Sequence, residues 1–382
     1  MTIAFLSHLD LNLYLFRLPI MQALVKEGHK VYAVCPKGDK FDLFGYYGIE
    51  AVAYNIERSS LNPFKEVKAI YNIYNAIKPL DLDILHTFTA KPNVYGTLAG
   101  KIAKVPRILN LVEGLGSFYV EDTFKNRVVR RLIETLYKVV FSLSQQVVFV
   151  NSDDPNYLEE QNVISPDKIT IIKSVGIDTK IFSPEAIDSE EITDLRASLG
   201  LGTKVVVLMV ARAIWHKGVR EFYEAAAKLS DNEDIQFILV GDIDEGNHSS
   251  ADKTYLKSGS ALWLGHRDDI LQLTSMSDIY VLPSYREGVP RTLLEAASMG
   301  KPIVTTDTVG CREVVKDGYN GFLVPVKNTE SLSQKIQLLA QDEGMRKIMG
   351  DNGRILAINE FGVHKIVEQY LHLYSSLLKE KN

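Results

Sequence analysis

Short apolar runs of the β-strand type alternate with longer amphipathic segments along most of the chain, and this alternation constrains the fold most strongly. The first run covers 2–7, an apolar-periodic segment covers 14–25, and a second run covers 30–35. The same pattern continues through 51–54, 63–78, 83–86, 93–103, 107–112 and 146–150. Strands that alternate with helices of about ten to fifteen residues predict a parallel sheet covered by helices on both faces.

The alternation stops once and then restarts. After a run at 169–172, a polar stretch holds Pro184 and five carboxylates between Glu185 and Asp194. Strand-like and helical segments then follow at 205–210, 218–229, 236–240, 261–264, 279–282, 290–299, 303–305, 328–340, 344–358 and 363–378. We therefore predict two doubly wound parallel-sheet domains and a final helix, with the boundaries 1–175, 176–362 and 363–382.

Composition excludes several classes of protein. The 382 residues carry a formal net charge of −5, which argues against a general nucleic-acid binder. The two cysteines, Cys35 and Cys311, form no disulfide framework or metal-binding motif, which is typical of a reducing cytoplasm. The first residues lack a basic region followed by a long apolar stretch, so we expect neither a signal peptide nor a membrane-spanning helix.

The segment 124–146 concentrates positive charge beside apolar side chains. Its basic residues are Lys125, Arg127, Arg130, Arg131 and Lys138, against one acidic residue, Glu134. Apolar residues recur between them at helical spacing, so the segment predicts a helix with a basic face beside an apolar one, suited to a membrane surface. A helix packed on the core with a solvated basic side fits the pattern equally well.

Two common nucleotide-binding motifs are missing. Gly114 and Gly116 have the first spacing of a dinucleotide fingerprint, but Tyr119 stands where the third glycine belongs. The chain also contains no P-loop sequence. A hydride-transfer enzyme and a P-loop nucleotidase are both disfavoured.

The loops after two strands of the second domain carry phosphate-binding chemistry. Arg212 and Lys217 follow the run 205–210, and two such cations suit a diphosphate, although both could instead form surface ion pairs. After the run 279–282, Gly288 permits close backbone approach and Pro290 suits a first helical turn, whose free N–H groups bind anions. Glu287 and Glu295 could accept hydrogen bonds from hydroxyls on either side of a phosphate. Together these features predict a sugar-nucleotide site.

Two Asp-x-Asp matches raise the question of a metal. Asp81 and Asp83 lead into a predicted strand, and Asp242 and Asp244 begin a polar loop. Both pairs fit turn residues better than a divalent-cation site, and the cations above already supply counter-charge. We predict no metal and no cofactor.

Several motifs together resemble the retaining glycosyltransferases of family 4, which have the GT-B fold. They are Arg212 with Lys217-Gly218, Glu287 and Glu295 in a Glu-x₇-Glu pattern, 175–178 with 182–184, 265–269, and 317–318 with 320–324. The resemblance covers essentially the whole chain. It implies an enzyme with an acceptor-binding first domain and a donor-binding second domain that face each other across a cleft, with the last helix packed back on the first domain.

The resemblance also implies roles for individual residues. Arg212 and Lys217 would bind the donor diphosphate, Glu287 the sugar hydroxyls and Glu295 the ribose. His266 and Arg267 fall where the family holds the nucleobase. The donor would also contact the segment of Gly288, Val289, Pro290, Arg291 and Thr292, which would supply backbone N–H groups. The catalytic set is Glu113, Arg212, Lys217 and Glu287.

Further motifs, at 58–64, 111–119, 172–176 and 215–219, are similar to one branch of this family. That branch transfers N-acetylgalactosamine, or another N-acetylhexosamine, from a UDP-sugar to undecaprenyl-diphosphate-linked diacetylbacillosamine, with an α-1,3 linkage, in N-glycan assembly. Such an enzyme would be cytoplasmic and peripheral at the inner face of the cell membrane. An O-antigen or capsule transferase, a UDP-sugar epimerase and a two-domain sugar-binding protein are the alternatives.

The acceptor side is predicted from residues after strands or at helix ends of the first domain. They are Ser7, His8, Arg17, Lys91, Glu113, Gly114 and Gly116. Arg17 and Lys91 would supply cations for the anionic diphosphate. The alternatives are a surface Arg17 and a solvated Lys91, and for Glu113 a carboxylate that only caps a turn. Glu113 departs from the family, because many members carry histidine there.

Overall fold

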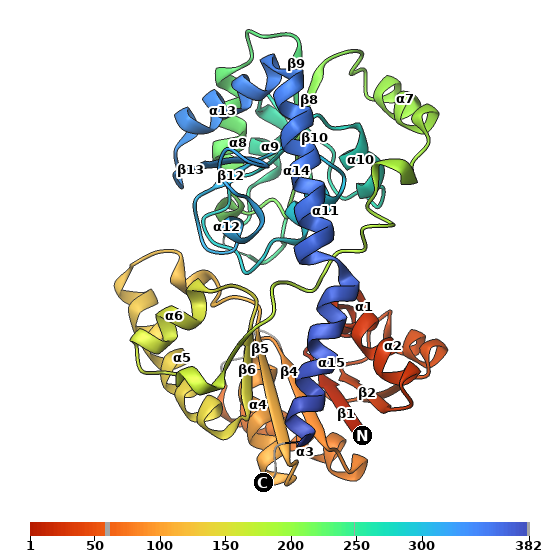
Figure 1. Cartoon of the computed structure of the whole chain (residues 1–382). Coiled ribbons are helices and arrows are strands. Elements are labelled where there is room, and N and C mark those ends of the chain that lie inside the picture. The colour runs from red at the N-terminus through yellow and green to blue at the C-terminus, as the bar shows by residue number, and fades with distance from the viewer. Residues whose placement is uncertain (58–61, 248, 380–382) are drawn as a thin grey trace. The chain divides into compact units, whose positions relative to one another are not determined.

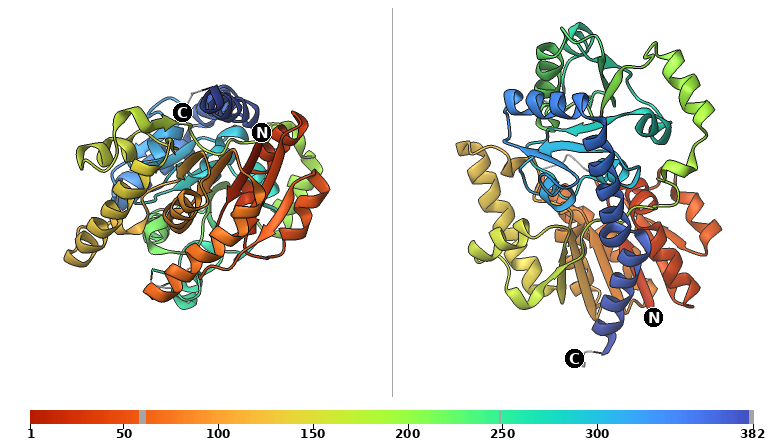
Figure 2. Two further views of the ribbon diagram at one scale, coloured as in Figure 1. Left: turned by 90° about the horizontal axis from the view of Figure 1, so that it is seen from below. Right: turned by 45° about the horizontal axis from the view of Figure 1, so that its top comes forward.

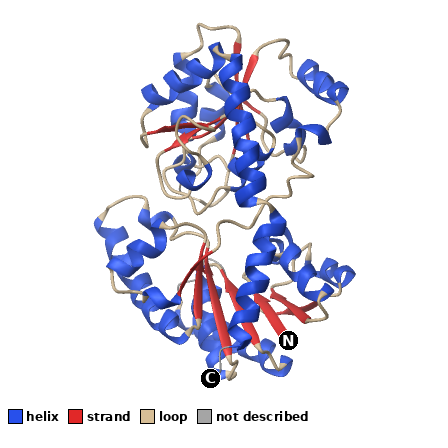
Figure 3. Cartoon of the chain, viewed as in Figure 1, coloured by secondary structure: helices blue, strands red, loops and turns tan. Residues whose placement is uncertain are grey.

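The structure is a computed structural model that describes residues 1–57, 62–247 and 249–379 (Figure 1). The chain divides into two compact units. The first unit contains Met1–Val175 together with His364 and the residues after it, and the second contains Gly176–Val363. Each unit is a parallel sheet with helices around it, so the predicted fold class is confirmed (Figure 3).

The sheet of the first unit has seven parallel strands in the order β3-β2-β1-β4-β5-β6-β7. Their bounds are β1 (Thr2–Leu6), β2 (Lys30–Cys35), β3 (Glu50–Ala53), β4 (Ile84–Phe88), β5 (Arg107–Val112), β6 (Gln146–Phe149) and β7 (Ile169–Ile171). β1 and β4 pair with Ile3 opposite Ile84, and the strand order reverses at this pair. Open α/β sheets bind ligands beyond the carboxyl ends of the strands at such a reversal, so the loops after β1 and β4 matter most.

The helices of this unit are α1 (Asp10–Phe16), α2 (Leu18–Lys26), α3 (Pro63–Ile77), α4 (Ala90–Ile102), α5 (Phe124–Leu143), α6 (Asp153–Glu160) and α15 (Val363–Lys379). The single helix predicted over 14–25 is wrong, because the chain breaks at Arg17 into α1 and α2. Pro19 lies in the first turn of α2 and has no N–H to continue α1. The break gives Arg17 a non-helical backbone.

The last helix packs on the first unit, as predicted. The ring Nδ1 of His86 in β4 lies 2.8 Å from the hydroxyl of Tyr374 in α15, and Arg107 Nε donates to the Leu377 carbonyl at 2.6 Å. Tyr370 and Tyr374 are buried against the sheet. Figure 2 shows α15 beside the strands of this unit from two further directions.

The sheet of the second unit has six parallel strands in the order β10-β9-β8-β11-β12-β13. Their bounds are β8 (Val205–Val210), β9 (Ile235–Val240), β10 (Leu262–Trp263), β11 (Ile279–Leu282), β12 (Ile303–Thr306) and β13 (Gly321–Val324). β8, the first strand of the unit in sequence, lies inside the sheet between β9 and β11, so the order reverses between β8 and β11. Apart from the edge strand β10, most residues of the strands are buried, which suits a sheet covered on both faces.

The helices of the second unit are α7 (Ser189–Ser198), α8 (Val219–Lys228), α9 (Lys253–Ser258), α10 (Ile270–Met276), α11 (Arg291–Ser298), α12 (Cys311–Val314), α13 (Thr329–Gln341) and α14 (Glu343–Phe361). α7 falls in the polar stretch where the sequence shows no periodicity, and the Asp188 side chain caps it by accepting from Glu190 N. None of the helices in the described residues is both long and apolar enough to cross a bilayer.

Candidate active site

The carboxyl ends of β8 and β11 meet at the reversal of strand order in the second sheet. The loop 211–218 follows β8 and the loop 283–290 follows β11, and Tyr285 N donates to the His216 carbonyl at 2.9 Å between them. Gly218, with φ +79°, lies so close that a Cβ there would be 2.2 Å from the Pro283 oxygen. Only glycine fits this position, so the sequence dictates the close approach of the two loops.

Lys217 and Glu287, predicted from separate motifs, form an ion pair across these loops. Lys217 Nζ lies 2.6 Å from Glu287 Oε1, and the two side chains are 23% and 11% exposed. The ammonium is a compact charge on a flexible stem and keeps some contact with solvent. The arrangement can therefore exchange its carboxylate partner for a ligand phosphate.

Arg212 lies at the same edge of the sheet but is paired with Asp244 and not with Glu287. Its Nη1 lies 2.5 Å from Asp244 Oδ2, in the loop after β9, and its side chain is mostly exposed. Asn247 Nδ2 donates to the same Asp244 oxygen at 2.9 Å. Sequence reasoning treated Asp244 only as a loop residue or metal ligand and missed it as the partner of Arg212.

The first turn of α11 faces the loop after β11. Pro290 precedes it, and no side chain caps this end of the helix. The N–H groups of a first helical turn point along the helix axis, away from the helix body. Gly310, after β12, supports the loop from behind: a Cβ there would lie 2.2 Å from the Gly288 oxygen, and Glu287 N donates to the Val309 carbonyl at 3.1 Å. A helix terminus held in this way suits an anion.

Glu295 lies about one turn into α11 and is buried. Its Oε1 accepts from Arg291 Nε at 3.0 Å, a pairing between helix neighbours that sequence reasoning missed although the spacing of four shows it. Burial raises the pKa of the Glu295 carboxyl to about 7, with Arg291 acting in the opposite direction. The carboxyl therefore titrates near neutral pH.

The pair predicted for the nucleobase follows β10. His266 is exposed, with Nε2 3.3 Å from Asp268 Oδ1, and the guanidinium of Arg267 bonds both oxygens of Asp269. This hydrogen bonding lowers the pKa of the Asp269 carboxyl. The side chains pair within their own loop, and their contact with a base stays a prediction.

In the first unit, the loops after β1 and β4 are joined by a hydrogen bond of 2.7 Å between His8 Nδ1 and Thr89 Oγ1. Thr89 has φ +73°, a conformation that non-glycine residues rarely adopt and that often marks functional sites. Ser7 is buried, and its hydroxyl donates to Asn12 Oδ1 at 3.2 Å. The predicted Ser7 and His8 thus lie at the reversal of the first sheet.

Glu113 directly follows β5 and forms an ion pair with Arg17. The Arg17 side chain has no exposed surface, whereas Glu113 is 29% exposed. Arg17 is therefore neither a surface residue nor the solvent-facing cation that an acceptor diphosphate requires. Gly114 and Gly116 after Glu113 have φ of +138° and +86°, which lets the chain turn sharply there.

Lys91 lies in the first turn of α4, and its side chain is 21% exposed. Its Nζ lies 2.9 and 3.1 Å from the two oxygens of Glu66 and donates to the Glu57 carbonyl at 2.9 Å. Both cations predicted for the acceptor thus carry carboxylate partners. Residues 58–61, part of the motif at 58–64, lie outside the described residues.

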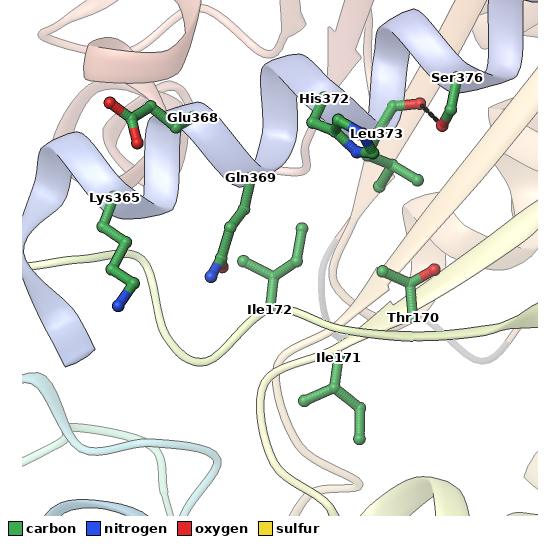
Figure 4. Close-up of a pocket in the computed structure, with 9 residues that line it drawn as sticks. All are labelled: Thr170, Ile171, Ile172, Lys365, Glu368, Gln369, His372, Leu373 and Ser376. Atoms are coloured by element: carbon green, nitrogen blue, oxygen red, sulfur yellow. Dashed lines mark hydrogen bonds between the residues drawn. The ribbon is translucent and has the colours of Figure 1, made fainter.

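A groove of about 600 Å³ lies elsewhere in the first unit, between β7 and α15. Figure 4 shows Ile171 and Thr170 on one side and Lys365, Gln369 and His372 on the other. None of the predicted site residues lines it.

The two doubly wound units, with paired charges at the carboxyl edges of both sheets, have the architecture of the GT-B fold. Residues 2–151 match the family model Glycosyl transferase 4-like, and residues 191–356 match Glycosyl transferases group 1. The chain belongs to this glycosyltransferase family.

One relative is the N,N'-diacetylbacillosaminyl-diphospho-undecaprenol alpha-1,3-N-acetylgalactosaminyltransferase of Campylobacter jejuni. It is 40% identical over 99% of this chain and 100% of its own length. The UDP-Gal:alpha-D-GlcNAc-diphosphoundecaprenol alpha-1,3-galactosyltransferase of Escherichia coli is 28% identical over 84% of this chain and 82% of its own.

Solved structures share the fold. A glycosyltransferase from Rickettsia africae superposes with a TM-score of 0.83 at 23% identity, covering 100% of this chain and 99% of its own. Anabaena Alr3699/HepE in complex with UDP gives 0.79 at 21% identity, covering 98% and 100%.

Proposed function

We propose that the enzyme transfers N-acetylgalactosamine, or another N-acetylhexosamine, from a UDP-sugar to undecaprenyl-diphosphate-linked diacetylbacillosamine, with an α-1,3 linkage. The observation that carries this proposal is the 40% identity, over the full length of both chains, to the Campylobacter transferase of that name. The Escherichia relative acts with other sugars but has the same linkage and lipid carrier in its name. Both relatives thus support the linkage and the lipid carrier, whereas the Campylobacter relative alone of these two supports the two sugars.

The donor would bind at the reversal of the second sheet. Lys217 would leave Glu287 for the diphosphate, whose other charge would meet the N–H groups at the start of α11 and Arg212. Glu287, released from the ammonium, would accept hydrogen bonds from sugar hydroxyls. Glu295 would face the ribose, and the loop 265–269 the base.

The transfer would retain the configuration of the sugar. In an oxocarbenium-like transition state the leaving diphosphate gains negative charge, which Lys217 and Arg212 stabilise electrostatically. The diphosphate itself then takes the proton of the acceptor hydroxyl on the same face, so no enzyme nucleophile is required. Glu113 would orient that hydroxyl or stabilise the positive charge on the ring.

The other functions are not favoured. The diacetylbacillosaminyl-diphospho-undecaprenol transferase matches at higher identity and coverage than the diphosphoundecaprenol galactosyltransferase and the capsular polysaccharide glycosyltransferase of Staphylococcus aureus. A UDP-sugar epimerase would need no lipid acceptor, and a binding protein would release no UDP.

The test measures UDP release from a panel of UDP-sugars with and without the synthetic lipid-linked diacetylbacillosamine. We expect release that depends on the acceptor and is fastest with UDP-N-acetylgalactosamine, and an α-1,3 linkage in the NMR spectrum of the product. Release independent of the acceptor, or a β linkage, would contradict the proposal.

We also place the enzyme at an anionic membrane surface through α5. Exposed apolar side chains follow one face of this helix at spacings of four and three, namely Phe124, Val128, Leu132, Leu136 and Val139. Phe124 is 78% and Leu132 61% exposed. An apolar stripe of this kind beside positive charge is the pattern of helices that lie in the membrane interface.

The basic residues beside this stripe differ from the set predicted. Arg130 is bonded to Asp122 and lies over the Tyr119 ring, so it does not belong to the exposed face. The exposed cations are Lys125, Arg127, Arg131 and Lys138. Near an anionic surface each contributes about 1 kcal/mol to binding.

Sedimentation with vesicles tests this placement. Changing those four residues to Gln should abolish binding to phosphatidylglycerol vesicles, while Lys253→Gln with Lys257→Gln, on α9 of the second unit, should not. Leu132→Ser should weaken binding even at high salt, where charge is screened. Unchanged sedimentation of the four-residue variant would remove the membrane claim.

A further inference from the structure

We infer that Arg17 is a positioning residue that fixes the Glu113 carboxylate for the acceptor hydroxyl, and that α15 completes the pocket that holds it. This inference rests on the proposed function, in which Glu113 meets the acceptor. It differs from a direct role of Arg17 in binding the acceptor, for which Arg17 has no exposed surface.

The backbone explains why Arg17 is buried. Pro19 ends α1 early, and the residue at the break adopts φ −122° and ψ −14° instead of continuing a surface helix. The guanidinium then lies under the loops of the carboxyl edge, 4.8 Å from the centre of the Phe88 ring at the end of β4. Phe88 is itself fully buried.

The groups around this guanidinium are uncharged. His86 is completely buried, and burial together with the charge of Arg17 holds its pKa well below the usual value, so its ring is neutral. The phenols of Tyr370 and Tyr374 are kept neutral because burial raises their pKa values. Within the described residues, Glu113 is the carboxylate that contacts Arg17.

A fully buried guanidinium without a counter-charge is unfavourable, so Arg17 must hold Glu113. Arg17 Nη2 donates to Glu113 Oε1, whereas Oε2 has no hydrogen-bond partner in the part of the chain that the structure describes. Arg17 thus fixes Oε1 of Glu113, and Oε2 remains for a ligand. This is the arrangement that a carboxylate needs to accept a hydrogen bond from a hydroxyl in one fixed orientation.

The C-terminal helix supplies two of the side chains near the guanidinium. Tyr374 holds His86 at 2.8 Å, and the charges of both Arg17 and Glu113 act on the Tyr370 phenol. The Tyr370 hydroxyl, His86 Nε2 and Arg17 Nε are buried without hydrogen-bond partners, and Arg17 Nη1 donates to the Phe16 carbonyl at 3.4 Å. The hydroxyl, the imidazole and the carbonyl carry no charge, so Glu113 supplies the counter-charge of the guanidinium.

A double-mutant cycle with Arg17→Met and Glu113→Gln tests the inference, with the full-length enzyme and whichever donor and acceptor the wild type uses. Each single change should lower kcat about 100-fold, within the range for a positioned acid or base, with the KM for the donor unchanged. The double variant should lose less than about threefold more, because Arg17 acts through Glu113. Arg346→Met, the same change on α14 of the second unit, where Arg346 Nη1 donates to the carbonyls of Leu339 and Ala340, is the control and should keep kcat within about twofold.

If the double variant lost kcat by the product of the two single losses, the inference would be overturned. An Arg17→Met enzyme with normal kcat would overturn it as well. Should Arg17→Met not fold, Arg17→Lys takes its place in the cycle with the same expectation of non-additivity.

Thermal unfolding gives a readout that needs no substrate. Glu113→Gln should lower the melting temperature more than Arg17→Met. Glu113→Gln leaves the buried Arg17 guanidinium without a counter-charge, whereas Arg17→Met leaves only the hydrated carboxylate of Glu113. The reverse order would contradict the pairing. If the wild type transfers no sugar to the lipid acceptor, the proposed function fails, and this comparison still decides the role of Arg17.

Discussion

Each of the two sheets carries an ion pair at its carboxyl edge, beside the reversal of strand order, but the two pairs are built in opposite ways. In the second unit the cation, Lys217, is the more exposed member at 23%, and the carboxylate of Glu287 lies deeper at 11%. In the first unit the cation, Arg17, is entirely buried, and the carboxylate of Glu113 is 29% exposed. The second unit thus offers a cation to a ligand, and the first unit offers an anion.

This difference follows the chemistry of the two proposed substrates. A diphosphate can compete with Glu287 for the ammonium, because Lys217 keeps some contact with solvent and lysine is flexible. No ligand can separate Arg17 from Glu113 without leaving a buried charge unpaired. The Lys217–Glu287 pair is therefore exchangeable, and the Arg17–Glu113 pair is fixed.

The largest expected effect is that of Lys217→Ala, which removes the exchangeable cation. Turnover should fall by about 10³-fold, the upper range for loss of one electrostatic donor to a developing charge, and UDP-sugar binding should weaken with it. Calorimetry and initial rates measure both. Binding and rates equal to the wild type, in a folded variant, would break the comparison on its donor side.

Glu113→Gln should separate the two units functionally. We expect calorimetry to show unchanged UDP-sugar binding, because Glu113 belongs to the other unit, together with turnover lowered by about 10²-fold or more. A fully active variant would reduce Glu113 to a turn residue.

A third carboxylate, that of Glu295, extends the comparison of the ion pairs, because it is buried and paired with Arg291 on its own helix. Its folded-state pKa of about 7 lies above the ordinary value of 4.5, so its contribution to stability is present below pH 4.5 and is lost as the pH rises through 7. Glu295→Gln should therefore have a larger free energy of unfolding than the wild type at pH 8, by roughly 3 kcal/mol at most, and a higher melting temperature. The gain should shrink as the pH is lowered toward 5. A gain that does not depend on pH would show that Glu295 is not ionised at pH 8.

The smallest expected effect is that of removing metal ions. Side chains and a helix terminus supply the positive charge in the proposed mechanism, so initial rates in EDTA should equal those in buffer. A loss of turnover in EDTA that Mg²⁺ restores would show that the second unit needs more counter-charge than Lys217 and Arg212 provide.

The sequence was sufficient for features that depend on neighbouring residues. Periodicity predicts both sheets, and strand-to-loop order places Lys217 and Glu287 at one edge. Asp81, with φ +47°, and Asp83, whose Oδ2 accepts from Thr2 N at 2.7 Å, are turn residues as predicted. The predicted metal independence depends on the experiment above.

Pairings between distant segments could not be predicted. Arg17 meets Glu113 across 96 positions, and Lys91 meets Glu66 across 25. Pattern alone cannot rank the many possible partners of a cation, because the choice depends on how the helices pack. One signal was available, since Pro19 predicts a break in the first helix and therefore an unusual position for Arg17.

The return of the last helix to the first unit has a consequence for folding during synthesis. N-terminal domains generally fold first as a chain is made, yet here His86 meets Tyr374 across 288 positions. The pocket around Arg17 therefore stays open until the whole second unit and α15 have left the ribosome. A chain that stops before α15 would have both sheets but would lack Tyr370 and Tyr374 beside Arg17.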